Sequence, residues 1–341
     1  MKRLILALSA AAAVALPASA QTVLTVSTWV PANHALTLAQ KDWCDLLEKN
    51  TSRKMRCNIL PRAVSAPAGT YDAIKNGVAD ISFTVHGYTP GRFVYSQMAE
   101  FPFLGNNAEP ISAAYSKIAA KYPQFAQEHQ DVHLLALFTH GPGFALNTKR
   151  PVTKLEELQG LKWRVGGGIA VALSNALGMN GTFKAAPETY ELLSAGVLDG
   201  ALFPADTIEG FKLQDLIKHA TTFEGGLYNT SFMFIMNKAR YEKLSAEERA
   251  AVDAISGEAA ARIYGRQWER ADRTGHALLQ SKGAQTVKAD AKFTADVKAR
   301  VAPLEAKWVQ DAAAKGLPDP AKVLAEFRAE IAKQASTPTT K

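Results

Sequence analysis

Two eleven-residue segments of the chain, 70–80 and 189–199, carry Thr, Tyr, Gly, Val and Asp at matching positions. Each segment predicts an amphipathic helix that ends at a glycine, Gly77 or Gly196, and is followed by a buried strand. Glycine suits such a helix end because it adopts the left-handed conformation without steric cost. Any helix–glycine–strand unit shares part of this pattern, but the matching letters favour two similarly built α/β lobes.

The segments around the first copy alternate between strand and helix patterns. β-Branched and apolar residues predict strands over 23–30, 55–60 and 80–85, and apolar residues at helical spacing predict a helix over 34–49. This alternation indicates an α/β fold with a largely parallel sheet. Few helix breakers occur from 250 to about 281, which predicts a long helix laid across both lobes, with a kink possible at one of its glycines.

The first twenty residues have the pattern of a secretory signal peptide. Lys2 and Arg3 are followed by an apolar run over 4–16 and by an A-x-A site that ends at Ala20. The run is too short for a membrane anchor, since a spanning helix needs roughly 20 apolar residues. About 320 residues remain, which favours two domains over one. We therefore expect an exported, periplasmic protein, with a disordered polar tail over 335–341.

Composition narrows the partners and cofactors. The formal charge is +7, from 39 Lys and Arg against 32 Asp and Glu, and the basic residues are scattered. Without a basic stripe or a reader motif, nucleic acid is not an expected partner, whereas a mild positive field suits anions. The seven histidines are dispersed. His129 and His133 have i,i+4 spacing, but the strand expected there argues against a metal site, so no metal or cofactor is predicted.

Cys44 and Cys57 are the only cysteines in the chain. An even number of cysteines, close in sequence and in an oxidising compartment, favours a disulfide between them. Two separate buried thiols are the alternative.

A strand predicted over 162–165 and a helix predicted over 169–177 are joined by three glycines, 166–168. Arg164 then lies at the carboxyl end of a strand, where open α/β sheets bind ligands. A guanidinium matches both oxygens of a carboxylate, and glycines before a helix leave backbone N–H groups open to an anion. Arg164 and Gly167 are therefore candidate ligand contacts. A structural ion pair and an ordinary loop are the alternatives.

The same region carries a family resemblance. Residues 155–165, LEELQGLKWRV, are similar to the D/E-L-x-G-L-K-x-R-V segment of the DctP-type binding proteins of TRAP transporters. Residues 188–200, ETYELLSAGVLDG, resemble that family's E-x-Y-x-A-L-x-x-G-x-x-D-G segment. The resemblance extends over essentially the whole mature chain.

The resemblance implies two Rossmann-like α/β lobes joined by crossing strands, a long C-terminal helix spanning both, and a ligand in the cleft between them. On this basis lobe I comprises 21–145 plus about 231–272, and lobe II comprises 146–230 plus about 273–334. The resemblance also implies that Arg164 binds the ligand's carboxylate. The implied partners are the small and large TRAP membrane subunits, driven by an ion gradient, and the implied state is a monomer.

Two departures from the family pattern bear on the ligand. Some members carry a second arginine where this chain has Ala145, and an asparagine where it has Phe203. A second carboxylate or many hydroxyls placed there would be left unpaired, at roughly 1–3 kcal/mol for each group. We therefore expect a monocarboxylate with an aromatic or apolar body, such as a hydroxy or 2-oxo acid.

Further cleft candidates come from the loops that follow strands. They are Trp29, His86, Tyr88, Tyr228 and Asp206, with His86 and Tyr88 preferred over His34. Trp and Tyr suit a cleft because they combine a flat apolar face with a polar group. Core packing or a surface position is the alternative for each. Arg92 is expected to form a structural ion pair.

The chain has no nucleophile elbow, zincin or P-loop motif. The sequence therefore predicts a receptor that closes on its ligand by a hinge motion, without catalysis. An ABC importer or a chemoreceptor as the partner is an alternative. A periplasmic enzyme that uses His86 or Glu188 as acid or base is another.

Overall fold

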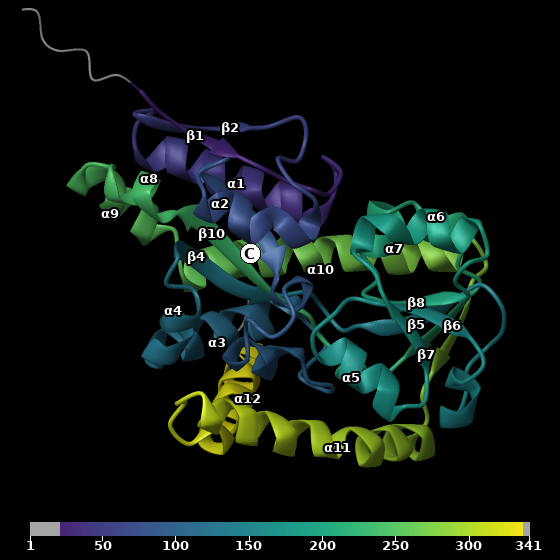
Figure 1. Ribbon diagram of the computed structural model, residues 1–341. Helices are drawn as coiled ribbons and strands as arrows, with labels where there is room; N and C mark the ends of the chain where they lie inside the picture. Colours follow the sequence, from purple (N-terminus) through teal and green to yellow (C-terminus); the bar gives the residue numbers. More distant parts are fainter. Residues whose placement is uncertain (1–20, 337–341) are drawn as a thin grey trace, which may run out of the picture.

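The computed structural model describes residues 21–336, which form two α/β lobes (Figure 1). Lobe I is built on a five-stranded sheet in the order β2-β1-β3-β10-β4. β1, β2 and β3 are parallel, whereas β10 runs antiparallel to both of its neighbours. The strands are β1 (Thr22–Val26), β2 (Met55–Ile59), β3 (Ile81–Val85), β4 (Val132–Thr139) and β10 (Ser231–Asn237).

Helices cover both faces of this sheet, so β3 and β10 are buried along their whole length. Strands covered on both faces are nearly continuous apolar runs, which matches their sequences. The helices of lobe I are α1 (Ala35–Asn50), η1 (Pro67–Gly69), α2 (Thr70–Lys75), η2 (His86–Tyr88), η3 (Tyr95–Glu100), α3 (Ala108–Lys121), α4 (Pro123–Glu128), α8 (Lys238–Glu242) and α9 (Ala246–Ala254).

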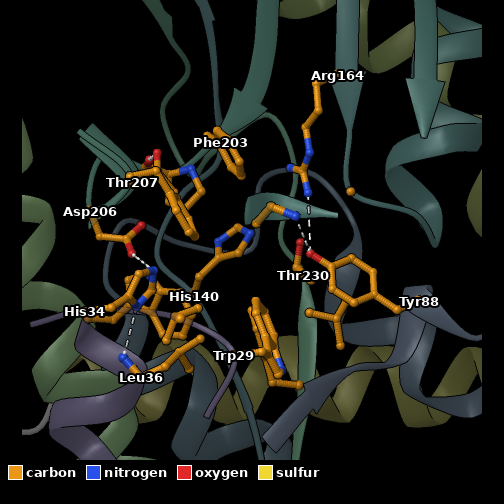
Figure 2. A pocket seen from close by; sticks show the side chains of 18 of the residues that line it. Trp29, His34, Leu36, Tyr88, His140, Arg164, Phe203, Asp206, Thr207 and Thr230 are labelled. Atoms are coloured by element: carbon orange, nitrogen blue, oxygen red, sulfur yellow. Dashed lines mark hydrogen bonds and ion pairs between the residues drawn. The ribbon is translucent and has the colours of Figure 1, made fainter. Parts of the chain in front are cut away.

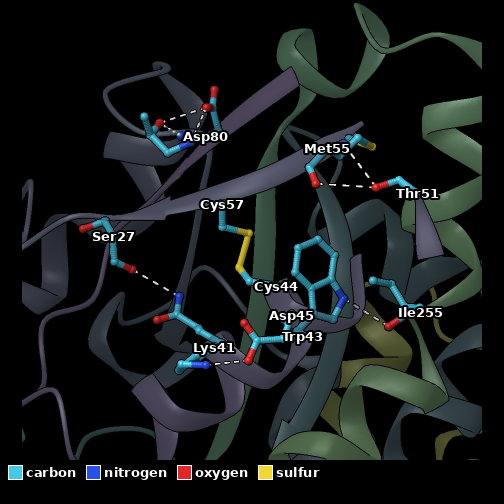
Figure 3. Close-up of a disulfide and its surroundings, with 12 residues drawn as sticks. Ser27, Lys41, Trp43, Cys44, Asp45, Thr51, Met55, Cys57, Asp80 and Ile255 are labelled. Carbon is cyan, nitrogen blue, oxygen red and sulfur yellow. Dashed lines mark hydrogen bonds and ion pairs between the residues drawn. A yellow bond between two sulfur atoms is a disulfide. The ribbon is translucent and has the colours of Figure 1, made fainter. Parts of the chain in front are cut away.

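The predicted disulfide between Cys44 and Cys57 is present and joins α1 to β2 (Figure 3). The two Cα atoms are 5.7 Å apart, within the usual range for a disulfide. Beside it, the Trp43 indole N–H donates to the carbonyl of Ile255 at 3.1 Å. These contacts fix α1 between the sheet and the segment after α9.

Lobe II has a six-stranded sheet in the order β11-β9-β5-β8-β6-β7. β6 is parallel to β7 and β8, and β5 is antiparallel to β8 and β9. The strands are β5 (Phe144–Asn147), β6 (Lys162–Val165), β7 (Asn180–Phe183), β8 (Gly200–Phe203), β9 (His219–Thr222) and β11 (Gln285–Lys288). The helices are η4 (Leu155–Leu158), α5 (Ile169–Ala176), η5 (Ala186–Glu188), α6 (Thr189–Ser194), α7 (Thr207–Gly210) and η6 (Leu213–Asp215).

The sequence repeat corresponds to a repeat in structure. In lobe I the order is η1, α2, Gly77 and β3, and in lobe II it is η5, α6, Gly196 and β8. Gly77 and Gly196 have φ angles of 74° and 68°, so both helices end at a left-handed glycine as predicted. The predicted fold class of two α/β lobes is confirmed.

Two extended segments cross between the lobes, 140–143 after β4 and 223–230 before β10. They hydrogen-bond to each other: the Gly143 N–H donates to Tyr228 O, and the Leu227 N–H donates to Gly143 O, each at 2.9 Å. The crossover is therefore a paired ribbon. β5 already belongs to lobe II at Phe144, slightly before the expected boundary at residue 145.

The long helix predicted across both lobes is α10 (Glu258–Ser281), which runs from lobe I to lobe II in Figure 1. It begins after Gly257 and is continuous past its internal glycines, so those residues do not break it. A Cβ at Gly265 would come within 2.4 Å of the Glu109 backbone in lobe I, and one at Gly275 within 1.8 Å of the Ala205 carbonyl oxygen in lobe II. The two glycines let α10 approach the backbone of each lobe.

The C-terminal helices are α11 (Ala291–Ala314) and α12 (Pro320–Ser336). α11 begins in the core of lobe II with Phe293 and reaches the core of lobe I with Trp308. α12 packs on α3 of lobe I. We expected all of 273–334 to belong to lobe II. The structure differs, because the apolar residues at the end of α11 and along α12 are buried in the core of lobe I.

The expected signal peptide, 1–20, and most of the expected tail lie outside the described residues; positions 335 and 336 form the end of α12. No helix within 21–336 combines the length and the hydrophobicity that crossing a bilayer requires.

Candidate functional site: a cleft between the lobes

A cavity lies between the two lobes (Figure 2). Both lobes, the crossover ribbon and α10 contribute to its wall. The lining residues are Trp29, Val30, His34, Leu36, Val85, Tyr88, His140, Arg164, Gly166, Ala186, Phe203, Pro204, Asp206, Thr207, Phe211, Tyr228, Thr230, Phe232 and Trp268.

Arg164 lies near the end of β6 and is only 3% exposed. Its Nε–H donates to the carbonyl of Lys184 at 2.9 Å, and its Nη1 donates to the carbonyl of Leu202 at 3.2 Å. These carbonyls belong to the segment after β7 and to β8, the two neighbours of β6. The backbone of both neighbouring strands therefore orients the guanidinium.

No carboxylate within 21–336 lies within 4.0 Å of the Arg164 guanidinium, so no protein acid neutralises this buried charge. A buried charge without a partner costs several kcal/mol. Nη2 lies 3.5 Å from the Tyr88 hydroxyl, and the Phe203 ring centroid is 4.2 Å from the guanidinium carbon. An aromatic face and a neutral hydroxyl offset part of this cost, and an anion in the cavity would offset much more.

Tyr88 of lobe I also connects the lobes directly. Its hydroxyl accepts a hydrogen bond from the Ala186 N–H of lobe II at 3.0 Å. Its ring packs on Trp29, with centroids 5.8 Å apart, and Trp29 donates its indole N–H to the Phe83 carbonyl at 3.1 Å. Burial raises the pKa of Tyr88, so the hydroxyl stays neutral. The structure is thus a closed form, with contacts across the mouth of the cleft.

The glycines after β6 form a second contact between the lobes. The carboxylate of Glu100 in lobe I accepts the Ile169 N–H at the start of α5 at 2.8 Å. A Cβ at Gly168 would come within 2.2 Å of that carboxylate, and one at Gly167 within 2.3 Å of the Gly87 carbonyl oxygen. The helix start does bind an anion, as its position predicts, but that anion is Glu100 of the protein itself. Burial raises the pKa of Glu100 to about 7.

Gly167 and His86 line a separate cavity. His86 is buried, and its Nε2 lies 2.9 Å from Nε2 of His129. The structure therefore does not bring His86 or Gly167 to the cavity that contains Arg164. Glu188, the other acid or base considered from the sequence, does not line it either and pairs with Lys184 near the surface.

Aromatic rings form most of the wall around Arg164. Trp29, Phe203 and Tyr228 were candidates from sequence, and Phe211, Phe232 and Trp268 join them. Tyr228 lies against Gly143, where a Cβ would come within 2.1 Å of its ring, so the crossover needs glycine there. Ala145 points into the core of lobe II and does not line the cavity. The apolar lining comes from the rings.

Asp206, predicted from the loop after β8, lines the cavity together with His34 and His140 (Figure 2). Nε2 of His34 lies 3.5 Å from its carboxylate. Asp272 of α10 accepts the Asp206 N–H at 2.9 Å. Burial, and to a smaller extent the charge of Asp272, raises the pKa of Asp206 well above its usual range. Burial also raises the pKa of Asp272, to about 7. Burial lowers the pKa of His34 to about 3, so this ring is neutral.

Within 21–336, no three His, Cys, Asp or Glu side chains are arranged to hold a metal ion. Arg92, expected to pair structurally, contacts Asp72 and Asp131 at 3.2 and 2.9 Å, and its guanidinium carbon lies 3.7 Å from the centre of the Tyr71 ring. The cationic group available to a ligand in the cavity is therefore Arg164.

The sequence matches the family DctP, bacterial extracellular solute-binding protein family 7, over residues 26–311. The chain belongs to this family. DctP proteins are solute-binding receptors, which agrees with the two-lobed fold and with a cavity between the lobes.

Solved structures of DctP-type proteins resemble the chain over almost their full length. A TRAP periplasmic solute-binding protein from Bordetella bronchiseptica, with bound (R)- and (S)-mandelate, is 39% identical, with a TM-score of 0.89 and coverage of 92% of this chain and 99% of that one. A marine metagenome TRAP protein specific for aromatic acids, in complex with metahydroxyphenylacetate, is 30% identical, with a TM-score of 0.86 and the same coverage. One from Rhodoferax ferrireducens, in complex with benzoate, is 28% identical, again with a TM-score of 0.86 and the same coverage.

Proposed function

We propose that this protein is the periplasmic receptor of a TRAP transporter and that it binds an aromatic monocarboxylate in the cleft, with the carboxylate on Arg164. The observation that carries the proposal is a guanidinium 3% exposed, oriented by two backbone carbonyls and without an acid partner within 21–336. Such a group requires an anion, and its planar fork matches a carboxylate.

The rest of the cavity favours an aromatic body. Seven Trp, Tyr and Phe rings line it, and a flat ligand can stack on them or meet them edge to face, at roughly 0.5–1.5 kcal/mol for each pair beyond area burial. A dicarboxylate would bury its second charge among these rings, where the lining offers no cation besides Arg164. The mandelate- and benzoate-bound relatives support the same ligand class.

Ligand binding in this proposal is coupled to hinge closure. The crossover ribbon is the hinge, and Tyr88 and Glu100 make the contacts that form when the lobes meet. A carboxylate that neutralises Arg164 stabilises the closed form over the open one, and only such differential contacts can shift the equilibrium. The receptor then delivers the solute to the TRAP membrane subunits without chemical conversion.

Export to the periplasm follows in this proposal from the leader pattern of residues 1–20 and from the family. A monomer is the expected state, because the two lobes of one chain enclose the whole cavity.

Isothermal titration calorimetry with the purified protein tests the ligand class. (R)-Mandelate, benzoate and 3-hydroxybenzoate represent aromatic monocarboxylates, and succinate and D-glucuronate represent dicarboxylates and sugar acids. At least one aromatic acid should bind about 100-fold more tightly than either comparison acid, since two unpaired polar groups cost roughly 2–6 kcal/mol. Tightest binding to succinate or D-glucuronate would contradict the proposal.

A further inference from the structure

One part of the cavity wall contains polar atoms that no group of the described chain satisfies. Nε2 of His140 has no hydrogen-bond partner within 21–336, and the two carboxylate oxygens of Asp206 have none of ordinary length, although His34 and Trp268 face that carboxylate. Asp206 and His140 are only 1% and 3% exposed. Buried polar atoms are almost always paired in folded proteins, so three atoms without an ordinary hydrogen bond around one cavity point to a ligand group that pairs with them.

The protonation state of His140 follows from its contacts. Its Nδ1–H donates to the carbonyl of Gly141. Burial lowers its pKa to about 4, so the ring is neutral and its single proton is on Nδ1. Nε2 therefore has a free lone pair and is a hydrogen-bond acceptor.

His34 is oriented in the opposite sense. The Leu36 N–H donates to its Nδ1 at 3.2 Å, so Nδ1 carries no proton and the neutral ring has its proton on Nε2. This Nε2–H points at Asp206 across 3.5 Å, which is longer than an ordinary N–H···O hydrogen bond. The indole N–H of Trp268 also faces the Asp206 carboxylate and forms no hydrogen bond of ordinary length within 21–336.

Asp206, His140 and His34 are grouped around the ring of Trp268. The Trp268 ring centroid is 5.9 Å from that of His140 and 6.3 Å from that of His34. Asp272 contacts two of the segments that carry this group. One of its carboxylate oxygens accepts the Asp206 N–H, and the other would lie 2.2 Å from a Cβ at Gly141, the neighbour of His140. We call Asp206, His140, His34 and Trp268 the distal subsite. In Figure 2, Asp206 and Arg164 lie on opposite sides of the cavity.

We propose that the distal subsite binds a hydroxyl group of the ligand, with Asp206 or His140 as acceptor, so that the ligand is a hydroxylated aromatic monocarboxylate. The inference rests on the proposed function above and adds the second polar group of the substrate.

The chemistry of the subsite selects a hydroxyl over other polar groups. It combines acceptors on Asp206 and His140 with donors on His34 and Trp268, and a hydroxyl both donates and accepts. An ammonium group cannot accept from the two N–H groups. A second carboxylate has no proton to donate to Nε2 of His140, and it would bury a further charge without a cation beside it.

Calorimetry with ligand pairs that differ by one hydroxyl tests this inference. The pairs are (R)-mandelate against phenylacetate, and 3-hydroxybenzoate and 4-hydroxybenzoate each against benzoate. At least one hydroxylated acid should bind the wild-type protein about tenfold or more tightly than its partner, because the partner leaves a buried acceptor unpaired. Equal affinities within every pair would overturn the inference but would leave the Arg164 proposal standing. Failure of all five acids to bind would overturn both.

Two variants locate the effect. Asp206→Ala keeps the backbone N–H that Asp272 accepts, and His140→Phe keeps the ring volume, so both are compatible with the fold. In at least one of them the hydroxyl preference should fall to about twofold or less, while the affinity for the hydroxyl-free acid is retained. Asp253→Ala is the matched control, since Asp253 also faces a histidine, His133 at 3.6 Å, but outside the cleft. An unchanged preference in both cleft variants would assign the hydroxyl to another part of the cavity and refute the subsite.

Discussion

Replacing Arg164 with Lys separates the geometry of the guanidinium from its charge. In the wild type, Nε and Nη1 donate to the carbonyls of Lys184 and Leu202. Nη2 makes one long contact of 3.5 Å, to the Tyr88 hydroxyl, so its second N–H and that of Nη1 are available to a carboxylate. An ammonium has three donors on one nitrogen and cannot serve both carbonyls and a two-oxygen acceptor with good geometry. The variant keeps the positive charge and loses at least one charge-assisted hydrogen bond to the ligand.

The size of the effect follows from that lost bond. A hydrogen bond to a charged group contributes roughly 1.5–3 kcal/mol, so Kd for an aromatic acid should rise about 10- to 150-fold in Arg164→Lys. Arg164→Met removes the charge as well and should cost roughly 3–5 kcal/mol, about 150- to 5,000-fold. The ligand-free stability of Arg164→Met should change little, because relief of a buried unpaired charge offsets two carbonyls left without donors.

Calorimetry with mandelate or benzoate measures Kd, and urea unfolding of the ligand-free proteins measures their free energy of unfolding. Arg92→Lys is the matched control: Arg92 is 30% exposed, pairs with Asp72 and Asp131, and lies outside the cleft. Its affinity should stay within about twofold of the wild type, since exposed pairs contribute little. Wild-type affinity in Arg164→Lys would refute the argument, as would a complex structure with the carboxylate bound elsewhere.

Three further outcomes are expected. The Cys44→Ala/Cys57→Ala variant should lose about 3 kcal/mol of unfolding free energy in urea, because the short disulfide loop no longer restricts the unfolded chain. Ionisation of Glu100 opposes folding, since its pKa is raised to about 7; stability should fall as pH rises from about 5 to 8, by up to roughly 3 kcal/mol from this group, and Glu100→Gln should flatten the curve. Gly275→Ala places a Cβ 1.8 Å from the Ala205 carbonyl oxygen and should lower the melting temperature by several degrees. Gly283→Ala is the comparison: its Cβ meets no atom within 4 Å and adds only the strain of a φ of 71°, so its melting temperature should fall less.

The parts of the site that sequence predicts are those fixed by local structure. Arg164 and Phe203 lie at or near the ends of short strands. The repeat that ends at Gly196 identifies the strand of Phe203, and the short apolar run before three glycines identifies the strand of Arg164, before any tertiary contact is known. The strand-end rule alone does not place a side chain. His86 follows β3, a strand buried on both faces, so no alternation of polar and apolar residues indicates which side its ring takes. The structure turns it towards His129.

Other members of the site depend on chain segments that meet only in the folded protein. His140 belongs to the crossover ribbon and Trp268 to the middle of α10, and neither has a local pattern that marks a ligand contact. The glycines after β6 show the same limit: their backbone correctly predicts an anion, but sequence cannot reveal that Glu100 fills the place. Only the coordinates show which predicted anion sites already have a partner. Glu100 occupies the start of α5, whereas Arg164 has no acid partner among the described residues.

The contrast between Glu100 and Arg164 explains how the contacts that close the lobes can differ from the group that binds the ligand. Glu100 and Tyr88 contact lobe II through groups that are satisfied within the protein, so these contacts favour closure whether or not a ligand is present. Arg164 opposes closure in the empty protein, because closure buries its charge without an anion. A ligand carboxylate removes that cost in the closed form alone. The shift in the open–closed equilibrium therefore depends on the difference between an unpaired and a paired guanidinium, and not on the total area that the ligand buries.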